Sequence, residues 1–114
     1  MNANGLISSY DETNDVLVCK LSENNGYIAN YAIACGVYLN VNKDNLPVSI
    51  FIENASDTLN VSKGILENSN VSLFLRCDKM EIDFELSIAD RQVFVARLKN
   101  SFNISSLCYG LTLN

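Results

Sequence analysis

The sequence predicts a single, mainly β domain, a β-rich α+β fold in which antiparallel hairpins and a C-terminal three-stranded meander are joined by a short helical segment. Apolar and polar residues alternate strictly over 80–88, as in a strand with one wet face. Turn-forming residues separate several such runs. Hydrophobic residues make up 48% of the 114 positions and are spread along the whole length, which suits one core. We therefore treat 1–114 as one domain.

The first expected element is a hairpin near the N-terminus. Two short apolar runs, 6–10 and 16–21, flank five consecutive polar residues, 11–15. Asp and Asn are frequent in tight turns because their side chains hydrogen-bond their own backbone. The pattern predicts two antiparallel strands around a turn.

A second hairpin is expected in the middle of the chain. Apolar residues occupy alternate positions in 37–41 and in 48–52, and 42–47 is rich in turn-forming residues. Pro47 suits the first position of a strand, where no ladder hydrogen bond has to be donated. The pattern leaves 22–35, between the two hairpins, unassigned.

The periodicity changes over 55–66, where a helical connection is expected. Ser56 or Asp57 is the expected N-cap of a short helix that carries Leu59 inward, and Ser62 is expected to begin a further turn. This segment would join the two β halves of the domain.

The C-terminal meander begins with 71–77, which also alternates, followed by Asp78-Lys79 as a two-residue turn into 80–88. In that register Arg76 lies opposite Glu81 on the outer side. The expected inward pairs are Cys77 with Met80, Leu75 with Ile82, and Leu73 with Phe84. The tail, 100–114, is apolar but not periodic and is expected to add an edge strand or to cover one.

The third strand of the meander, 92–99, is ambiguous because 93–96 are all apolar. A two-residue loop before it would turn Arg97 toward the core, where an unpaired charge is very costly. A three-residue loop, 89–91, sets Arg97 against Asp83 instead. It also brings Phe94, Ala96 and Leu98 inward and places Lys99 against Glu81. The three-residue loop is therefore the prediction.

Charge makes nucleic acid a poor partner. The formal net charge is −5, whereas phosphate binding depends on Lys and Arg that displace counterions. The chain shows no signal-peptide pattern and no run of about eighteen apolar residues, so a bacterial-type cytoplasmic protein that does not contact a membrane is expected. A basic protein partner suits the negative electrostatic field of such a chain, although modest negative charge is also common in soluble proteins.

Several kinds of chemistry are disfavoured by residue types alone. The chain has no histidine, which excludes Ser-His-Asp triads, Cys-His dyads and His-containing zinc sites. Neither of the common glycine-rich phosphate-binding motifs is present. The four cysteines form no Cys-x-x-Cys pair and are expected to be buried thiols. The sequence therefore predicts no cofactor and no metal site, with catalytic residues unknown.

Carboxylates are the remaining candidates for surface chemistry. Glu81, Asp83 and Glu85 form an acidic row along one strand, and Asp11 and Asp15 lie in the first turn. The row is interpreted as surface pairing with Arg76, Arg97 and Lys99, because functional carboxylates normally sit in a cleft. For the two aspartates the turn role is favoured over cation binding.

Three segments, taken in order and at their spacing, resemble an uncharacterised bacterial family, domain of unknown function 2283. They are Ser9-Tyr10-Asp11-Glu12 with Asp15-Val16-Leu17, then Gly36-Val37-Tyr38-Leu39-Asn40, then the run from Leu46 to Ser56. The resemblance covers residues 9 to 56 and implies a compact unit of two hairpins. It also implies a neutralising, antitoxin-like role beside a small toxin-like protein.

The leading hypothesis is a non-enzymatic protein-interaction module that binds a partner through a sheet edge or an aromatic surface. The five tyrosines, Tyr10, Tyr27, Tyr31, Tyr38 and Tyr109, are candidates for that surface. The alternative is a domain that binds a small ligand or performs carboxylate-dependent catalysis. A homodimer with paired edge strands is a further possibility.

Overall fold

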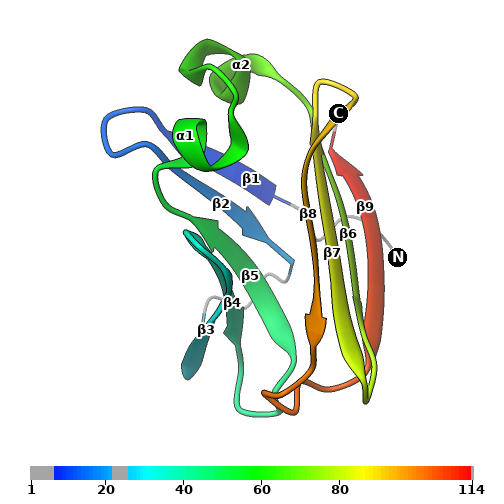
Figure 1. Ribbon diagram of the computed structural model, residues 1–114. Coiled ribbons are helices and arrows are strands. Elements are labelled where there is room, and N and C mark those ends of the chain that lie inside the picture. The colour runs from blue at the N-terminus through cyan, green and yellow to red at the C-terminus, as the bar shows by residue number, and fades with distance from the viewer. Residues whose placement is uncertain (1–6, 22–25, 114) are drawn as a thin grey trace.

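The computed structural model describes residues 7–21 and 26–113, which form two facing β-sheets, a sandwich (Figure 1). The first sheet contains β1 (Ile7–Asp11), β2 (Val16–Lys20), β3 (Ala29–Ala34), β4 (Val37–Val41) and β5 (Pro47–Ile52). The second contains β6 (Val71–Cys77), β7 (Glu81–Ile88), β8 (Arg91–Lys99) and β9 (Leu107–Leu113). Two short helices, α1 (Ala55–Leu59) and α2 (Lys63–Asn68), connect the sheets at one end. The predicted mainly β class is confirmed.

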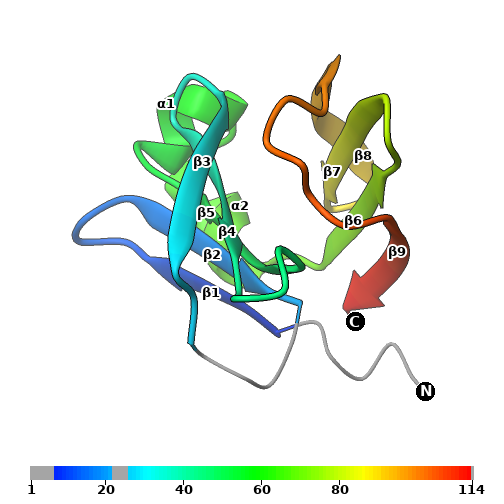
Figure 2. The same cartoon turned by 90° about the horizontal axis from the view of Figure 1, so that it is seen from below.

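Neighbouring strands are antiparallel throughout both sheets. Their order is β1-β2-β5-β4-β3 in the first sheet and β8-β7-β6-β9 in the second. Figure 2 shows the sheets face to face, with β3 and β8 on one side of the sandwich and β1 and β9 on the other. The first hairpin therefore joins the second along β5, and the helical connection carries the chain across to β6.

One hydrophobic core fills the space between the sheets. Every second side chain of a strand points to the same face, so the alternating patterns of both halves meet there. The first sheet contributes Leu39, Ile50 and Ile52, and the second contributes Leu75, Phe84 and Leu86, all fully buried.

Both hairpins of the first half are confirmed, and β5 begins at Pro47 as expected. Part of the unassigned segment becomes the edge strand β3, whose pattern is diluted by alanines on both faces. The tail adds β9 beside β6, one of its two expected roles. Leu6, in the first predicted strand, lies outside the described residues.

The expected register between β6 and β7 is wrong by two residues. Arg76 lies opposite Asp83 rather than Glu81. The core pairs shift in the same way, so that Cys77 faces Ile82, Leu75 faces Phe84 and Leu73 faces Leu86. Because the shift is even, every side chain of these strands except at the turn keeps its predicted face.

Asp78 explains the shift. Its carboxylate accepts hydrogen bonds from the backbone N–H groups of Met80 at 2.8 Å and Glu81 at 2.9 Å, and its own N–H donates to the Glu81 carbonyl at 3.0 Å. Such Asp-centred turns compete well with alternative backbone pairings. The two-residue turn is consequently Lys79-Met80, and Met80 is 73% exposed instead of pointing inward.

Between β7 and β8 the predicted register is confirmed but the predicted loop is wrong. The turn consists of two residues, Ala89 and Asp90, with φ of 53° and 62°, the left-handed values of a type I′ turn. A β-bulge at Val93 then inserts the extra residue on β8. Turn and bulge together restore the alignment of Arg97 with Asp83.

This turn offers a stability test, because alanine is poorly suited to left-handed backbone and Asn-Gly is the preferred type I′ pair. The double variant Ala89→Asn, Asp90→Gly should have a free energy of unfolding about 1 kcal/mol higher than wild type, measured by urea denaturation. Lys79→Asn in the other hairpin serves as the control and should change it little. A double variant no more stable than wild type would contradict the assigned turn type.

The expected N-cap of α1 is also wrong. The cap position is Asn54 rather than Ser56 or Asp57, its backbone is left-handed with φ of 49°, and its side chain makes no capping hydrogen bond. The second cap is confirmed, since the Ser62 hydroxyl accepts from the Ile65 N–H at 3.4 Å. The donors at the start of α1 are satisfied from another part of the chain, as the geometry around Asp15 shows.

Candidate functional site

Asp11 stabilises the turn in which it lies. Its carboxylate accepts hydrogen bonds from the Asn14 backbone N–H at 3.2 Å and from the Asn14 side-chain amide at 2.7 Å. The side-chain hydrogen bond from Asn14 is the main cause that lowers the pKa of Asp11. This geometry corresponds to the turn role expected for Asp11.

Asp15 lies in the same turn but binds a different part of the molecule. Its Oδ1 accepts from the Tyr10 hydroxyl at 2.6 Å and from the Ser56 N–H at 3.0 Å, and its Oδ2 accepts from the Ser56 hydroxyl at 2.6 Å. Asp15 therefore caps the N-terminus of α1 from a distant turn. Burial alone would raise the pKa of Asp15, but the hydrogen bonds from Ser56 and Tyr10 outweigh it and lower the pKa. Burial, followed by the bond to Asp15, raises the pKa of Tyr10 to about 12.

The acidic row of β7 pairs with arginines from both neighbouring strands. Arg76 hydrogen-bonds Asp83, with Nε to Oδ2 at 3.1 Å, and its Nη2 lies 3.3 Å from Glu81 Oε1. Arg97 approaches from β8, with Nε 3.6 Å from Asp83 Oδ1. The hydrogen bond to Asp83 is the main cause that raises the pKa of Arg76. Glu81 and Asp83 thus belong to an ion-pair cluster on the outer face of the second sheet.

Asp83 differs from its prediction, because it was expected to meet water and is only 6% exposed. It lies on the central strand of the cluster, opposite Arg76 on β6 and Arg97 on β8. Glu85, opposite Phe74 and Val95, lies outside this cluster of charges. Among the side chains that the structure describes, 8–21 and 26–106, no three Cys, Asp or Glu groups are placed to hold a metal ion. The five candidate carboxylates therefore do not come together at one site, and none of them lines the pockets of about 250 to 320 Å³.

The thiols differ in their exposure. Cys19 and Cys77 are buried, and burial raises their pKa values to about 12 and about 11, so both are protonated at neutral pH. Cys35 is exposed in the β3–β4 turn, which contradicts the expectation of a buried thiol. The side chain of Cys108 lies outside the described part of the structure.

The outer face of the first sheet carries a candidate surface for binding. Two rows of side chains run across its strands, each residue opposite the next in register. The apolar row is Val18, Phe51 and Tyr38, and the polar row is Lys20, Ser49, Asn40 and Asn30. We call these two rows, together with Tyr27, the aromatic face.

Hydrogen bonds fix the polar row across three strands. The Asn30 amide donates to Asn40 Oδ1 at 2.7 Å, and the Asn40 amide donates to the Ser49 hydroxyl at 2.8 Å. Asn40 is 5% exposed and Ser49 is 9% exposed, although both point away from the core. Partners on both sides hold the Asn40 amide in one orientation, so this part of the face is preorganised.

Two hollows lie on the aromatic face, with volumes of about 250 and 300 Å³. Both are lined by Tyr27, Asn40 and Phe51, so they adjoin. Tyr27 is 53% exposed. Large aromatic groups beside fixed amides can bury apolar groups of a partner while they satisfy its polar atoms.

Tyr38 lies between Phe51 and Glu53 on the aromatic face. Its ring lies 6.2 Å from the Phe51 ring, tilted by 58°. Its hydroxyl donates to Glu53 Oε1 at 2.6 Å, and this hydrogen bond is the main cause that raises the pKa of Tyr38. Tyr38 therefore presents an oriented, neutral phenol at the edge of the second hollow.

The tyrosine hypothesis identified only part of this surface. Tyr27 and Tyr38 lie on it, whereas Tyr10 packs against the core and Tyr31 stacks on Phe102 with ring centroids 4.5 Å apart. The side chain of Tyr109 lies outside the described residues. The sequence feature that could have identified the rest is the alternation of the two predicted strands, which places Asn40, Ser49 and Phe51 on the outer face of the sheet.

Comparison with family models, with curated proteins and with solved structures finds no match for this chain. The resemblance of residues 9–56 to domain of unknown function 2283 therefore stays a prediction. None of the helices in the described ranges is long and apolar enough to cross a membrane.

Proposed function

We propose that this protein is a non-enzymatic protein-interaction module that binds its partner through the aromatic face. The main support for this proposal is the composition of that face. The outer side of a sandwich sheet usually carries charged and polar residues in contact with water. Here it carries Phe51, Tyr38 and Tyr27 around two adjoining hollows. Tyr and Phe are enriched in protein interfaces, and Tyr is frequent among the few residues that contribute most of the binding energy.

Catalysis by carboxylates is less well supported. Among the residues that line the two hollows, Glu53 is the carboxylate, and it already accepts the Tyr38 hydroxyl. A general acid or base needs a free position from which to reach a substrate proton. The surface is therefore better suited to binding.

The chemistry of the partner follows from charge. The net charge of −5 attracts a basic protein and speeds its encounter with this one. The family resemblance supports the same kind of partner, a small toxin-like protein that this chain would neutralise in the bacterial cytoplasm. The proposal is thus an antitoxin-like module, and nucleic acid and membranes are not its partners.

A separate protein is favoured over a second copy of this chain that pairs along β8, one of the four edge strands. The edge strand β8 carries the exposed cationic residues Arg91, Arg97 and Lys99. Charged side chains along an edge are a common protection against pairing with another strand. Two copies would also repel each other through their net negative charge.

Alanine substitution of the aromatic face tests the proposal. The partner is first captured from the native cell with the wild-type chain, identified and purified, and its affinity is measured by calorimetry. Tyr27→Ala combined with Phe51→Ala should weaken binding by about ten-fold or more. Met80→Ala removes a more exposed apolar side chain from the other sheet and should leave the affinity unchanged. Equal affinity for both variants, or no stoichiometric partner, would contradict the proposal.

A further inference from the structure

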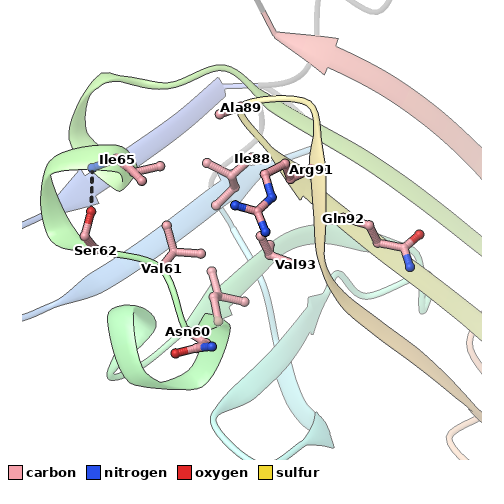
Figure 3. A pocket seen from close by; sticks show the side chains of 10 residues that line it. Asn60, Val61, Ser62, Ile65, Ile88, Ala89, Arg91, Gln92 and Val93 are labelled. Carbon is pink, nitrogen blue, oxygen red and sulfur yellow. Dashed lines mark hydrogen bonds between the residues drawn. The ribbon is translucent and has the colours of Figure 1, made fainter.

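A further pocket, of about 320 Å³, lies at the end of the sandwich that carries the helices (Figure 3). The segment from α1 to α2 forms one wall and the β7–β8 hairpin forms the other. Its apolar lining consists of Leu59, Val61, Ile65, Ile88 and Val93. Ile65 remains 45% exposed, so apolar surface is left open to a ligand.

Arg91 is the charged residue of this pocket. In Figure 3 its side chain extends from β8 toward the wall formed by the helical connection, whereas Gln92 points to the other side of the strand. The pocket lining contains no carboxylate, and Asp90, next to Arg91 in the chain, is not part of it. Among the described residues, the ion pairs involve Arg76 and Arg97, not Arg91.

The other polar side chains of the lining, Asn60, Ser62 and Gln92, carry no charge. The Ser62 hydroxyl already accepts the Ile65 N–H as a helix cap. The Arg91 guanidinium therefore offers its donors to a ligand, in a protein whose net charge is −5. A guanidinium matches a carboxylate in shape and charge, with two parallel hydrogen bonds.

We infer that this pocket binds a carboxylate attached to a short apolar chain. Arg91 would hold the carboxylate at the rim, and the apolar chain would lie against Val61, Ile65 and Ile88. The volume lies at the lower end of the range of small-molecule sites, so the pocket has room for a small ligand such as a short-chain acid. Such a group occurs in free short-chain acids and at the C-terminus of a polypeptide that ends in an apolar residue.

The site is separate from the aromatic face, because no residue lines both. Binding of a ligand at this pocket is therefore independent of the proposed protein partner and of the carboxylates of the protein.

Titration with sodium hexanoate, followed by amide chemical shifts in NMR, tests the inference on the full chain. We expect saturable shifts around the α1–α2 connection and the β7–β8 turn. Affinity should increase by about four-fold for each methylene group that is buried, from acetate to hexanoate. N-acetyl-leucine in a parallel titration distinguishes a polypeptide C-terminus from a free acid, according to which binds more tightly.

Two comparisons isolate the role of Arg91. Arg91→Gln should weaken hexanoate binding by about ten-fold or more, whereas Lys99→Gln, an equal charge change on the same strand outside the pocket, should not. Neutral hexanamide should bind wild type as weakly as hexanoate binds the Arg91 variant. Absence of saturable shifts with both acids, or equal loss in the two variants, would overturn the inference. The amide spectrum of each variant shows directly that it is folded.

Discussion

Phe84→Ala should lower the free energy of unfolding by about 3–5 kcal/mol, the largest effect expected of any single change considered for this protein. Phe84 is fully buried on β7, between β6 and β8, and its ring lies 6.0 Å from that of Phe94. Truncation would leave a cavity in the core that both sheets share. Chemical denaturation monitored by circular dichroism measures the loss.

Phe74→Ala provides a matched control for this experiment. Phe74 belongs to the neighbouring strand β6, but it lies opposite Glu85 on the outer face and is only partly buried. Its truncation should cost much less than that of Phe84, and both variants should still unfold in a single transition. Equal losses at the two positions would contradict the assignment of inner and outer faces.

The second large effect is expected at Asp15. Asp15→Asn should lower the free energy of unfolding by about 1–3 kcal/mol, because an amide cannot accept all the hydrogen bonds that the carboxylate accepts from Tyr10 and Ser56. The change would weaken the joint between the β1–β2 turn and α1. Asp11→Asn in the same turn is the control and should cost less, since the Asp11 carboxylate accepts its hydrogen bonds from Thr13 and Asn14 within its own turn and does not reach another element through them.

The pH dependence of stability tests the same joint. The pKa of Asp15 is lower in the folded protein than in the unfolded chain. Its contribution to stability is therefore fully present above the unfolded pKa, about 4, and is lost as pH falls through the folded pKa. Wild type should lose stability below about pH 4, and Asp15→Asn should lose less over the same range. An equal loss of unfolding free energy below pH 4 in the two proteins would contradict the role assigned to Asp15.

Period-two alternation was sufficient to predict the fold class and most strands, because burial on one face selects side chains at every second position. It could not set the β6–β7 register, since a shift of two residues preserves every face. The hydrogen bonds of Asp78 decide that register. The β7–β8 loop shows a related limit, because a two-residue turn plus a bulge aligns the strands as a three-residue loop would.

The candidate site was less predictable than the fold. Alternation places Asn40, Ser49 and Phe51 outward, but only the strand order brings β4, β5 and β2 side by side. Asp15 was correctly placed in a turn, yet its bond to Ser56 spans 41 positions of the chain. The pocket at Arg91 likewise combines two segments that are distant in sequence. Local patterns carry no information about such contacts.

A photo-crosslinking residue, p-benzoylphenylalanine, incorporated in place of Tyr27 in the native cell shows whether the aromatic face contacts a partner protein. If the aromatic face binds a partner protein, irradiation should yield one discrete crosslinked species with a second, basic protein. The same residue in place of Met80, on the turn of the other sheet, should yield none. A crosslink at Met80 but not at Tyr27, or a product that contains only this chain, would contradict the claim.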